Sequence, residues 1–190
     1  MEIDARIVID CCEDVYAPAE DTYLMIESLS IDEGENVLEI GCGTGIISLH
    51  CARNGAKVTA SDISDKAVEC AIMNARKNDI DIIVLNSDLF EEVNDKFDLI
   101  IFNPPYLPAD NVIDITFSGG DSGVEISIEF LSQCGAYLRR GGRAVLIISS
   151  LSDFDKFKSA ADELDFSIRK LAEKPLFFER ITVYELRLKK

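Results

Sequence analysis

The 190-residue sequence contains no tryptophan, one histidine and no cysteines spaced as C-x-x-C. A metal site built by this chain is therefore not expected. The six cysteines are expected to be reduced thiols. The adjacent Cys11 and Cys12 could instead form a redox pair, which is the other interpretation. The longest apolar run, from Ala144 to Ile148, is far below the roughly 18–20 residues that cross a bilayer. The acidic start of the chain also lacks the basic residues of a signal peptide. These absences predict a soluble, cytoplasmic protein.

Positive charge is scarce as well. The chain has 19 Lys and Arg against 35 Asp and Glu, a net charge of −16, and the acids are concentrated in its N-terminal arm. Such a surface repels a phosphate backbone, so direct binding of nucleic acid is not expected. A hydrophobic content of 47% is enough to build a core, and the length fits one domain over residues 1–190, with residues 1–30 forming an arm plus a helix.

Residues 37–165 alternate β-rich apolar runs with helical patterns, which is typical of βαβ units around a parallel sheet. Five strands are predicted at residues 37–40, 57–62, 82–85, 97–102 and 143–148, and an antiparallel pair at 166–171 and 181–188. Helices are predicted at residues 18–29, 46–54, 66–78 and 153–164, with a further one ending near residue 138 before a turn at Gly141 and Gly142. The pattern indicates an α/β protein.

A glycine-rich turn joins the first strand to the next helix. Gly41, Gly43 and Gly45 alternate there, with Glu39 two residues upstream. Glycines allow the backbone to approach a ligand closely and to adopt positive φ, although a purely structural turn would use them too. A dinucleotide site would need a glycine where Ile46 stands. The spacing instead resembles motif I of class I S-adenosylmethionine-dependent methyltransferases.

Two further acids follow neighbouring strands. Asp62 ends the second strand, where a carboxylate can accept both hydroxyls of a ribose, and Asp88 follows the third, where it can accept from an adenine amino group. Either acid alone would more often cap a turn. Together with Glu39 they would meet at the carboxyl edge of a parallel sheet, where such folds bind ligands. An acidic pocket suits S-adenosylmethionine, which is a net cation.

Asn103-Pro104-Pro105-Tyr106 ends the fourth strand and is the most specific motif in the chain. Two prolines could simply terminate a strand, because neither can donate to a ladder. The functional interpretation uses all four residues: the Asn103 and Pro104 carbonyls accept the two hydrogens of a planar amino group, and Tyr106 stacks on it. Its lone pair can then turn toward the sulfonium methyl, and the prolines fix the alignment beforehand. Positioning, without a general base, would carry the catalysis.

This motif and the segment Val15-Tyr16-Ala17-Pro18-Ala19-Glu20-Asp21-Thr22-Tyr23 resemble the HemK-like methyltransferases, which modify a glutamine in peptide chain release factors. The resemblance covers nearly the whole chain and is to the short archaeal and eukaryotic branch. It implies a catalytic segment at Asn103, Pro104, Pro105 and Tyr106, and a loosely matching glycine-rich loop at residues 118–123 that closes on the substrate. It implies S-adenosylmethionine contacts from Thr22, Glu39, Gly41, Gly43, Gly45, Asp62, Asp88, Leu89 and Asn103.

The resemblance also implies a Rossmann-like sheet of seven mostly parallel strands, in the order 3-2-1-4-5-7-6 with strand 7 antiparallel. The strand from Ile82 to Leu85 would then lie at the edge, where it is too apolar to stay uncovered. Short-branch members pair with a small zinc-binding activator, so we expect a partner to add a strand there. Shielding by the chain's own loops is the alternative.

Other functions remain open from the sequence. Adenine-N6 methylation of DNA or RNA would use the same chemistry at Asn103. The net negative charge and the lack of a further domain to hold a duplex and flip a base argue against this function. Lysine is a less natural substrate, because its amine must first be deprotonated. A non-enzymatic, cofactor-binding scaffold is a further alternative, but it would not need the intact motif at Asn103. His50 is expected to be a packed or surface residue. Phe177 and Phe178 are either a core pair or a partner contact.

Overall fold

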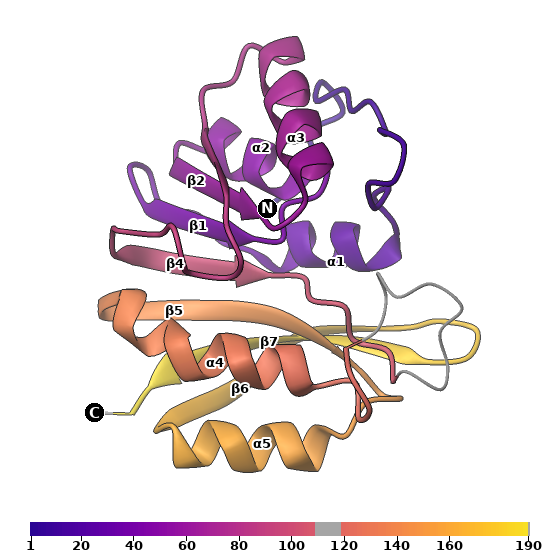
Figure 1. Ribbon diagram of the computed structural model, residues 1–190, viewed down its shortest axis with the longest axis vertical. Coiled ribbons are helices and arrows are strands. Elements are labelled where there is room, and N and C mark those ends of the chain that lie inside the picture. Colours follow the sequence, from indigo (N-terminus) through magenta and orange to yellow (C-terminus); the bar gives the residue numbers. More distant parts are fainter. Residues whose placement is uncertain (109–118, 190) are drawn as a thin grey trace.

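The structure, a computed structural model, describes residues 1–108 and 119–189. These residues form one seven-stranded sheet in the order β3-β2-β1-β4-β5-β7-β6 (Figure 1). The pairs among the first five strands are parallel, and β7 runs antiparallel to both β5 and β6. The predicted sheet order and the antiparallel seventh strand are confirmed.

The elements follow the predicted sequence of strands and helices. The strands are β1 Asn36–Ile40, β2 Lys57–Asp62, β3 Ile83–Asn86, β4 Phe97–Phe102, β5 Leu138–Ser149, β6 Phe166–Pro175 and β7 Arg180–Leu188. The helices are α1 Glu20–Ser28, α2 Ile46–Arg53, α3 Asp65–Lys77, α4 Glu125–Tyr137 and α5 Phe154–Glu163. In the described part of the chain, no helix is long and apolar enough to cross a membrane.

Several boundaries shift by a few residues, and the start of β5 differs most from the prediction. The turn expected at Gly141 and Gly142 does not precede β5, because the strand already begins at Leu138 and runs through both glycines. Gly141 has a φ of +83°, and the register of β5 against β4 shifts between Phe97 and Leu99. The glycines therefore form an irregularity within a paired strand.

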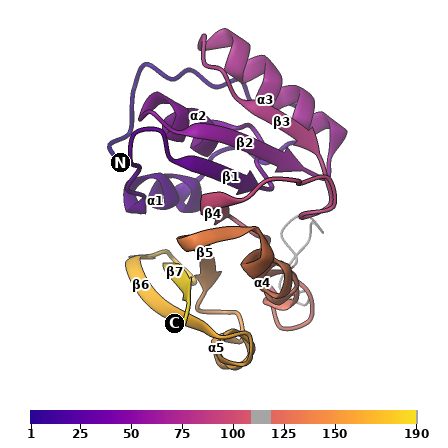
Figure 2. The ribbon, with the colours of Figure 1, turned by 90° about the vertical axis from the view of Figure 1, so that its left-hand side faces the viewer.

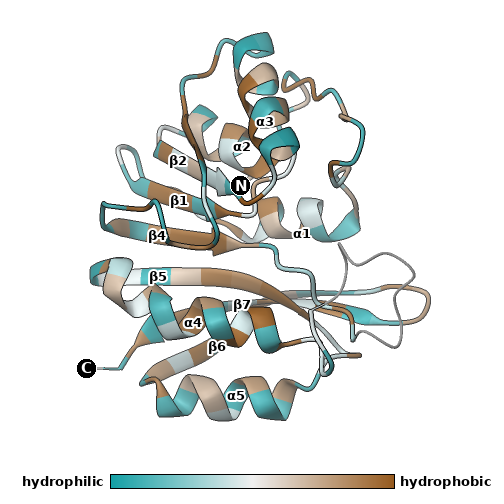
Figure 3. Ribbon diagram, viewed as in Figure 1, coloured by the Kyte–Doolittle hydropathy of each residue, from teal (hydrophilic) through white to brown (hydrophobic). Residues whose placement is uncertain are grey.

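Helices cover both faces of the sheet (Figure 2). Side chains of α1 and α2 pack on one face and those of α4 and α5 on the other, while Ala71 of α3 packs on Ala60 of β2. In Figure 3, β4 is brown along most of its length and β5 along its second half, whereas the helices alternate brown and teal. Strands buried on both faces read as continuous apolar runs, which is why the sequence revealed them.

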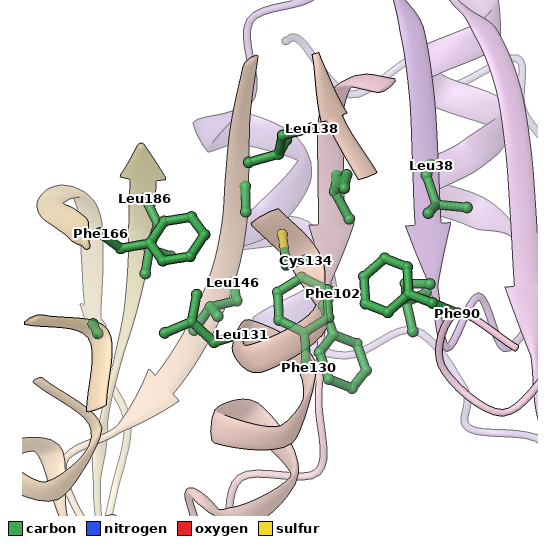
Figure 4. Close-up of a cluster of buried hydrophobic side chains, with 14 of the residues drawn as sticks. Leu38, Phe90, Phe102, Phe130, Leu131, Cys134, Leu138, Leu146, Phe166 and Leu186 are labelled. Carbon is green, nitrogen blue, oxygen red and sulfur yellow. The ribbon is translucent and has the colours of Figure 1, made fainter. Parts of the chain in front are cut away.

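The core beneath α4 supports the carboxyl end of β4. The rings of Phe90, Phe102 and Phe130 lie together there, with Leu131 and Leu146 beside them (Figure 4). The ring centroid of Phe102 lies 4.9 Å from that of Phe130. Because Phe102 is the last residue of β4, this packing fixes the point where the chain enters the Asn103 motif.

The N-terminal arm runs along α3 and is fastened to it. Side chains of Asn74 and Asn78 bind the arm backbone at Asp10 and Val8. Cys12 of the arm forms a disulfide with Cys70 of α3, with the two Cα atoms 6.1 Å apart.

The expectation of reduced cysteines is therefore wrong for Cys12 and Cys70. The pairing depends on the path of the arm across α3, which brings together two residues 58 apart in the chain. Cys11 is exposed and free, so Cys11 and Cys12 do not form a redox pair with each other.

Candidate active site

A cavity of about 550 Å³ opens at the carboxyl ends of β1, β2 and β4. Its walls come from five places: the arm and the start of α1, the glycine turn and the start of α2, the ends of β2 and β3 with the residues after them, the segment after β4, and helix α4. The volume lies within the range of sites for small-molecule ligands. Of the predicted site residues, the cavity is lined by Thr22, Glu39, Gly41, Gly43, Asp62, Asp88, Leu89, Asn103, Pro104, Pro105 and Tyr106.

The glycine turn forms the floor between β1 and α2. Gly41 and Gly43 line the cavity with φ values of +64° and +52°, which disfavour any residue with a side chain. Gly45 is not among the cavity residues. It has a φ of +80° at the start of α2, and a Cβ there would lie 3.1 Å from the Cβ of Ala71. Gly45 therefore serves helix packing, whereas the other two leave room for a ligand.

Glu39 is buried at the end of β1 with 2% of its surface exposed. Burial raises the pKa of its carboxyl group to about 8, although the Ser48 amide, 2.8 Å from Oε2, and the Ser48 hydroxyl both donate to the carboxylate and oppose the shift. The charge of Asp62 adds to the increase. Glu39 is thus a carboxyl group that a nearby cation would help to ionise.

Asp62 shapes the same wall from the end of β2. Its Oδ2 accepts from the amide of Gly43 at 2.9 Å, and its Oδ1 accepts from the amide of Ser64 at 3.0 Å. These bonds hold the carboxylate against the glycine turn. Asp88 and Leu89 follow β3 and complete the wall.

The segment after β4 is held on several sides. The Ser152 hydroxyl donates to the Tyr106 carbonyl at 2.5 Å, and the Gly119 amide donates to the Leu107 carbonyl at 2.8 Å. A Cβ on Gly119 would lie 2.7 Å from the Pro105 carbonyl oxygen, and one on Gly123 would lie 2.8 Å from that of Tyr106. In this structure the described part of the glycine-rich loop packs directly on the Asn103 motif, while Ser118 lies outside the described residues.

Asp21, in the first turn of α1, was missed by the sequence reasoning, which chose only its neighbour Thr22. Its side chain lies 82 residues from Asn103 in the chain, yet its Oδ2 accepts from Asn103 Nδ2 at 2.9 Å. The hydroxyl of Tyr106 lies 3.4 Å from the same oxygen, and that of Tyr16 donates to Oδ1 at 2.8 Å. The only sequence signal for Asp21 is its place in the segment Val15 to Tyr23, which resembles the family.

Asn103 has one amide end engaged and the other free. Its Nδ2 donates to Asp21, whereas its Oδ1 is buried without a hydrogen-bond partner within residues 1–108 and 119–189. A buried acceptor without a partner is costly, so such a group indicates a missing ligand. Asn103 lines the cavity, and the missing donor can come from there.

The cavity fits S-adenosylmethionine. It combines a turn that admits close backbone approach with several carboxyl groups, among them Glu39, Asp62 and Asp88, and this set suits a ligand that is a net cation. The open acceptor on Asn103 lies in the same cavity.

Three other residues considered from the sequence lie outside this cavity. His50 is buried in α2, where its Nδ1 lies 2.8 Å from the Ile46 carbonyl and its Nε2 accepts from the Asp4 amide at 3.2 Å. It is a packed residue, as expected. Phe177 and Phe178 are 91% and 84% exposed at the tip of the β6–β7 hairpin, so they are not a core pair.

The reversed seventh strand and the ligand cavity at the carboxyl edge define a class I methyltransferase. The "Methyltransferase small domain" model matches residues 18–161. The chain belongs to this family, within its HemK-like members, and is an S-adenosylmethionine-dependent methyltransferase.

Individual relatives agree. The chain is 40% identical over 177 residues, 90% of each chain, to the "Putative protein N5-glutamine methyltransferase MJ0928" of Methanocaldococcus jannaschii. It is 33% identical to the human "Methyltransferase HEMK2" over 135 residues, 62% of this chain and 63% of that one. The E. cuniculi Mtq2–Trm112 complex, titled as responsible for methylation of the eRF1 translation termination factor, shares the fold with a TM-score of 0.74 and 23% identity, covering 93% of this chain and 99% of that one.

Proposed function

We propose that this protein transfers a methyl group from S-adenosylmethionine to the side-chain amide nitrogen of a glutamine in a peptide chain release factor. The observation that carries this proposal is the buried Oδ1 of Asn103, which lacks a partner in the described chain and belongs to the cavity wall. The names of the relatives from Methanocaldococcus jannaschii and E. cuniculi support the same substrate class.

The acidic wall would hold the donor. Glu39 and Gly41 would bind its methionine end, Asp62 its ribose, and Asp88 with Leu89 its adenine, while Thr22 lines the cavity near the Asn103 motif. When bound, S-adenosylmethionine supplies an electrophilic methyl group on a sulfonium. We propose no role for Gly45 in binding, because it lies outside the cavity wall.

The Asn103 motif would prepare the acceptor. A carboxamide nitrogen is a poor nucleophile because its lone pair is delocalised into the carbonyl. The Asn103 Oδ1 and the Pro104 carbonyl would accept its two hydrogens, and Tyr106 would stack on its plane. The new N–C bond forms as the S–C bond breaks, and the nitrogen then releases one proton to solvent. The contacts of Ser152 and Gly119 with this segment keep it rigid, so little reorganisation is required.

We further propose that a partner protein adds a strand to β3. This strand lies at the edge of the sheet, and Ile83 is 60% exposed there. Within the described residues no strand pairs with its outer side, which leaves unpaired backbone groups beside an apolar surface. A small zinc-binding activator would suit this edge, and the Mtq2 relative is titled as a complex with Trm112.

The test compares methyl transfer from radiolabelled S-adenosylmethionine into a release factor, the same factor lacking its acceptor glutamine, duplex DNA and RNA. We expect label only in the intact release factor. Asn103→Ala should bind the donor as the wild type does and transfer no methyl. Label in the glutamine-lacking factor or in nucleic acid would contradict the proposed substrate, and unchanged turnover by Asn103→Ala would contradict the proposed chemistry.

A further inference from the structure

The side-chain amide of Asn103 has two nearly isosteric ends, and catalysis as proposed above requires that the oxygen be offered to the substrate. Backbone geometry does not decide this, because a rotation of the amide by 180° exchanges the two ends. Asp21 does decide it. The carboxylate oxygen Oδ2 lies 2.9 Å from Asn103 Nδ2 and can only accept a hydrogen bond, so the rotated amide would set two acceptor oxygens against each other.

We propose that Asp21 is a positioning residue that keeps Oδ1 of Asn103 available to the substrate amide; this inference rests on the proposed function. The carboxylate itself is fixed from its other side. Its Oδ1 accepts from the Thr22 amide at 2.7 Å and from the Tyr16 hydroxyl at 2.8 Å. With 3% of its surface exposed, Asp21 has little access to water that could replace these donors.

The two tyrosines around Asp21 remain donors over the working pH range. Burial raises the pKa of Tyr16 and of Tyr106 well above the ordinary value, and the charge of Asp21 adds to the increase. Their hydroxyls therefore stay protonated and can donate to the carboxylate. Asp21 thus joins α1, the arm and the Asn103 motif through donors on both of its oxygens.

The variant Asp21→Asn separates positioning from simple packing. The Thr22 amide and the Tyr16 hydroxyl both need an acceptor, so the new amide oxygen should face them and its NH2 should face Asn103. Asn103 would then rotate to accept from that NH2 and would offer its own NH2 to the substrate. The substrate amide would lose its acceptor.

The exchange variant Asp21→Asn with Asn103→Asp should restore the pattern. A carboxylate at position 103 accepts from the NH2 at position 21 with one oxygen and offers the other to the substrate. Asn103→Asp alone would place two carboxylates against each other across 2.9 Å. If the single variants lost activity only through altered shape or packing, the exchange variant would not be expected to regain it. Each single substitution is already nearly isosteric, so combining the two would correct no difference in shape.

The experiment measures donor affinity and the maximal rate of methyl transfer to the release factor for wild type, both single variants and the exchange variant. We expect Asp21→Asn to lower the rate by about 100-fold or more, as for the loss of one positioned hydrogen-bond partner of a reacting group, with little change in donor affinity. The exchange variant should exceed both single variants. Asp98→Asn is the matched control, since Asp98 accepts from Asn36 at the opposite end of the sheet. Wild-type turnover by Asp21→Asn, or an exchange variant no faster than its parents, would overturn the inference.

Nuclear magnetic resonance of the free protein provides a second measurement. The side-chain NH2 resonances of Asn103, assigned by their loss in Asn103→Asp, should exchange slowly with solvent and should shift in Asp21→Asn. Rapid exchange in the wild type would overturn the inference. If wild type transfers no methyl to the release factor, the proposed function fails, while these resonances still decide the role of Asp21.

Discussion

Replacing Glu39 by glutamine should weaken donor binding and remove its pH dependence between pH 6 and pH 7. Burial raises the pKa of this carboxyl group to about 8, so in the free protein at neutral pH the protonated form dominates. The ammonium of the donor would favour the ionised form. Glu39 must therefore lose its proton when the donor binds, and binding should tighten as the pH rises toward that pKa.

The size of the effect follows from the pKa. With a value of about 8, about one molecule in eleven is ionised at pH 7 and about one in a hundred at pH 6, so donor affinity should rise about ninefold between these values. A charge-assisted hydrogen bond contributes about 1.5–3 kcal/mol, or roughly 13- to 160-fold in affinity. After the elevenfold cost of ionisation, Glu39→Gln should bind the donor up to roughly 15-fold more weakly than wild type at pH 7.

Isothermal titration calorimetry with S-adenosylmethionine at both pH values measures the effect. Glu27→Gln, an exposed substitution of the same kind, is the control and should keep the wild-type pH dependence. Stability should move in the opposite direction: the folded state holds the Glu39 proton more tightly than the unfolded chain, so the free energy of unfolding should fall as the pH rises from the ordinary glutamate value toward 8. Equal pH dependence of donor affinity in Glu39→Gln and wild type would refute this reasoning.

Two further predictions concern the disulfide and the edge strand. Reduction by a dithiol, or Cys70→Ser, should lower the free energy of unfolding by roughly 4 kcal/mol, because the bond closes a loop with a separation of 58 residues. Urea unfolding with and without reductant measures this, and Cys11→Ser should behave as wild type; equal stability of the oxidised and reduced protein would contradict it. If an activator adds a strand to β3 as proposed, Ile83→Lys should weaken its binding more than about tenfold and leave donor affinity unchanged, because the charge disfavours strand addition. Titration with the purified activator measures this, and undiminished affinity would exclude β3 as the interface.

Much of the fold could be predicted because its signals are local. The strand Phe97–Phe102 has the predicted bounds, since an apolar run buried on both faces meets two prolines directly after Asn103. Ser64 caps α3, with its side chain accepting from the Ala67 amide, and a serine before a helical pattern is a local signal of this kind. The turn predicted at Gly141 and Gly142 was wrong because glycine is common both in turns and at irregular positions within strands. Only the pairing of β5 with β4 distinguishes the two cases.

Many residues of the candidate site could be predicted from the sequence, but the contacts between distant residues that hold the site together could not. The acids at the ends of β1 and β2 and just after β3 lie around one cavity because parallel strands end at a common edge. The disulfide between Cys12 and Cys70 depends on the route of an arm without regular structure, which no local pattern encodes. The contact of Asp21 with Asn103 likewise requires that the start of α1 meet the end of β4.

The acids at this edge of the sheet divide into two kinds. Glu39, Asp62 and Asp88 line the wall proposed for a cationic donor, whereas Asp21 lines the same cavity with its oxygens already bonded to hydroxyl and amide donors of the protein. A negative charge that already binds protein donors can hold the orientation of Asn103 whether or not the donor is bound. In the proposed mechanism the Asn103 oxygen accepts hydrogens from a planar nitrogen, and this contact by itself would not distinguish glutamine from adenine. Other parts of the protein surface must therefore discriminate between a glutamine and an adenine substrate. The net charge of −16 disfavours the phosphate backbone of a nucleic acid and favours a protein substrate.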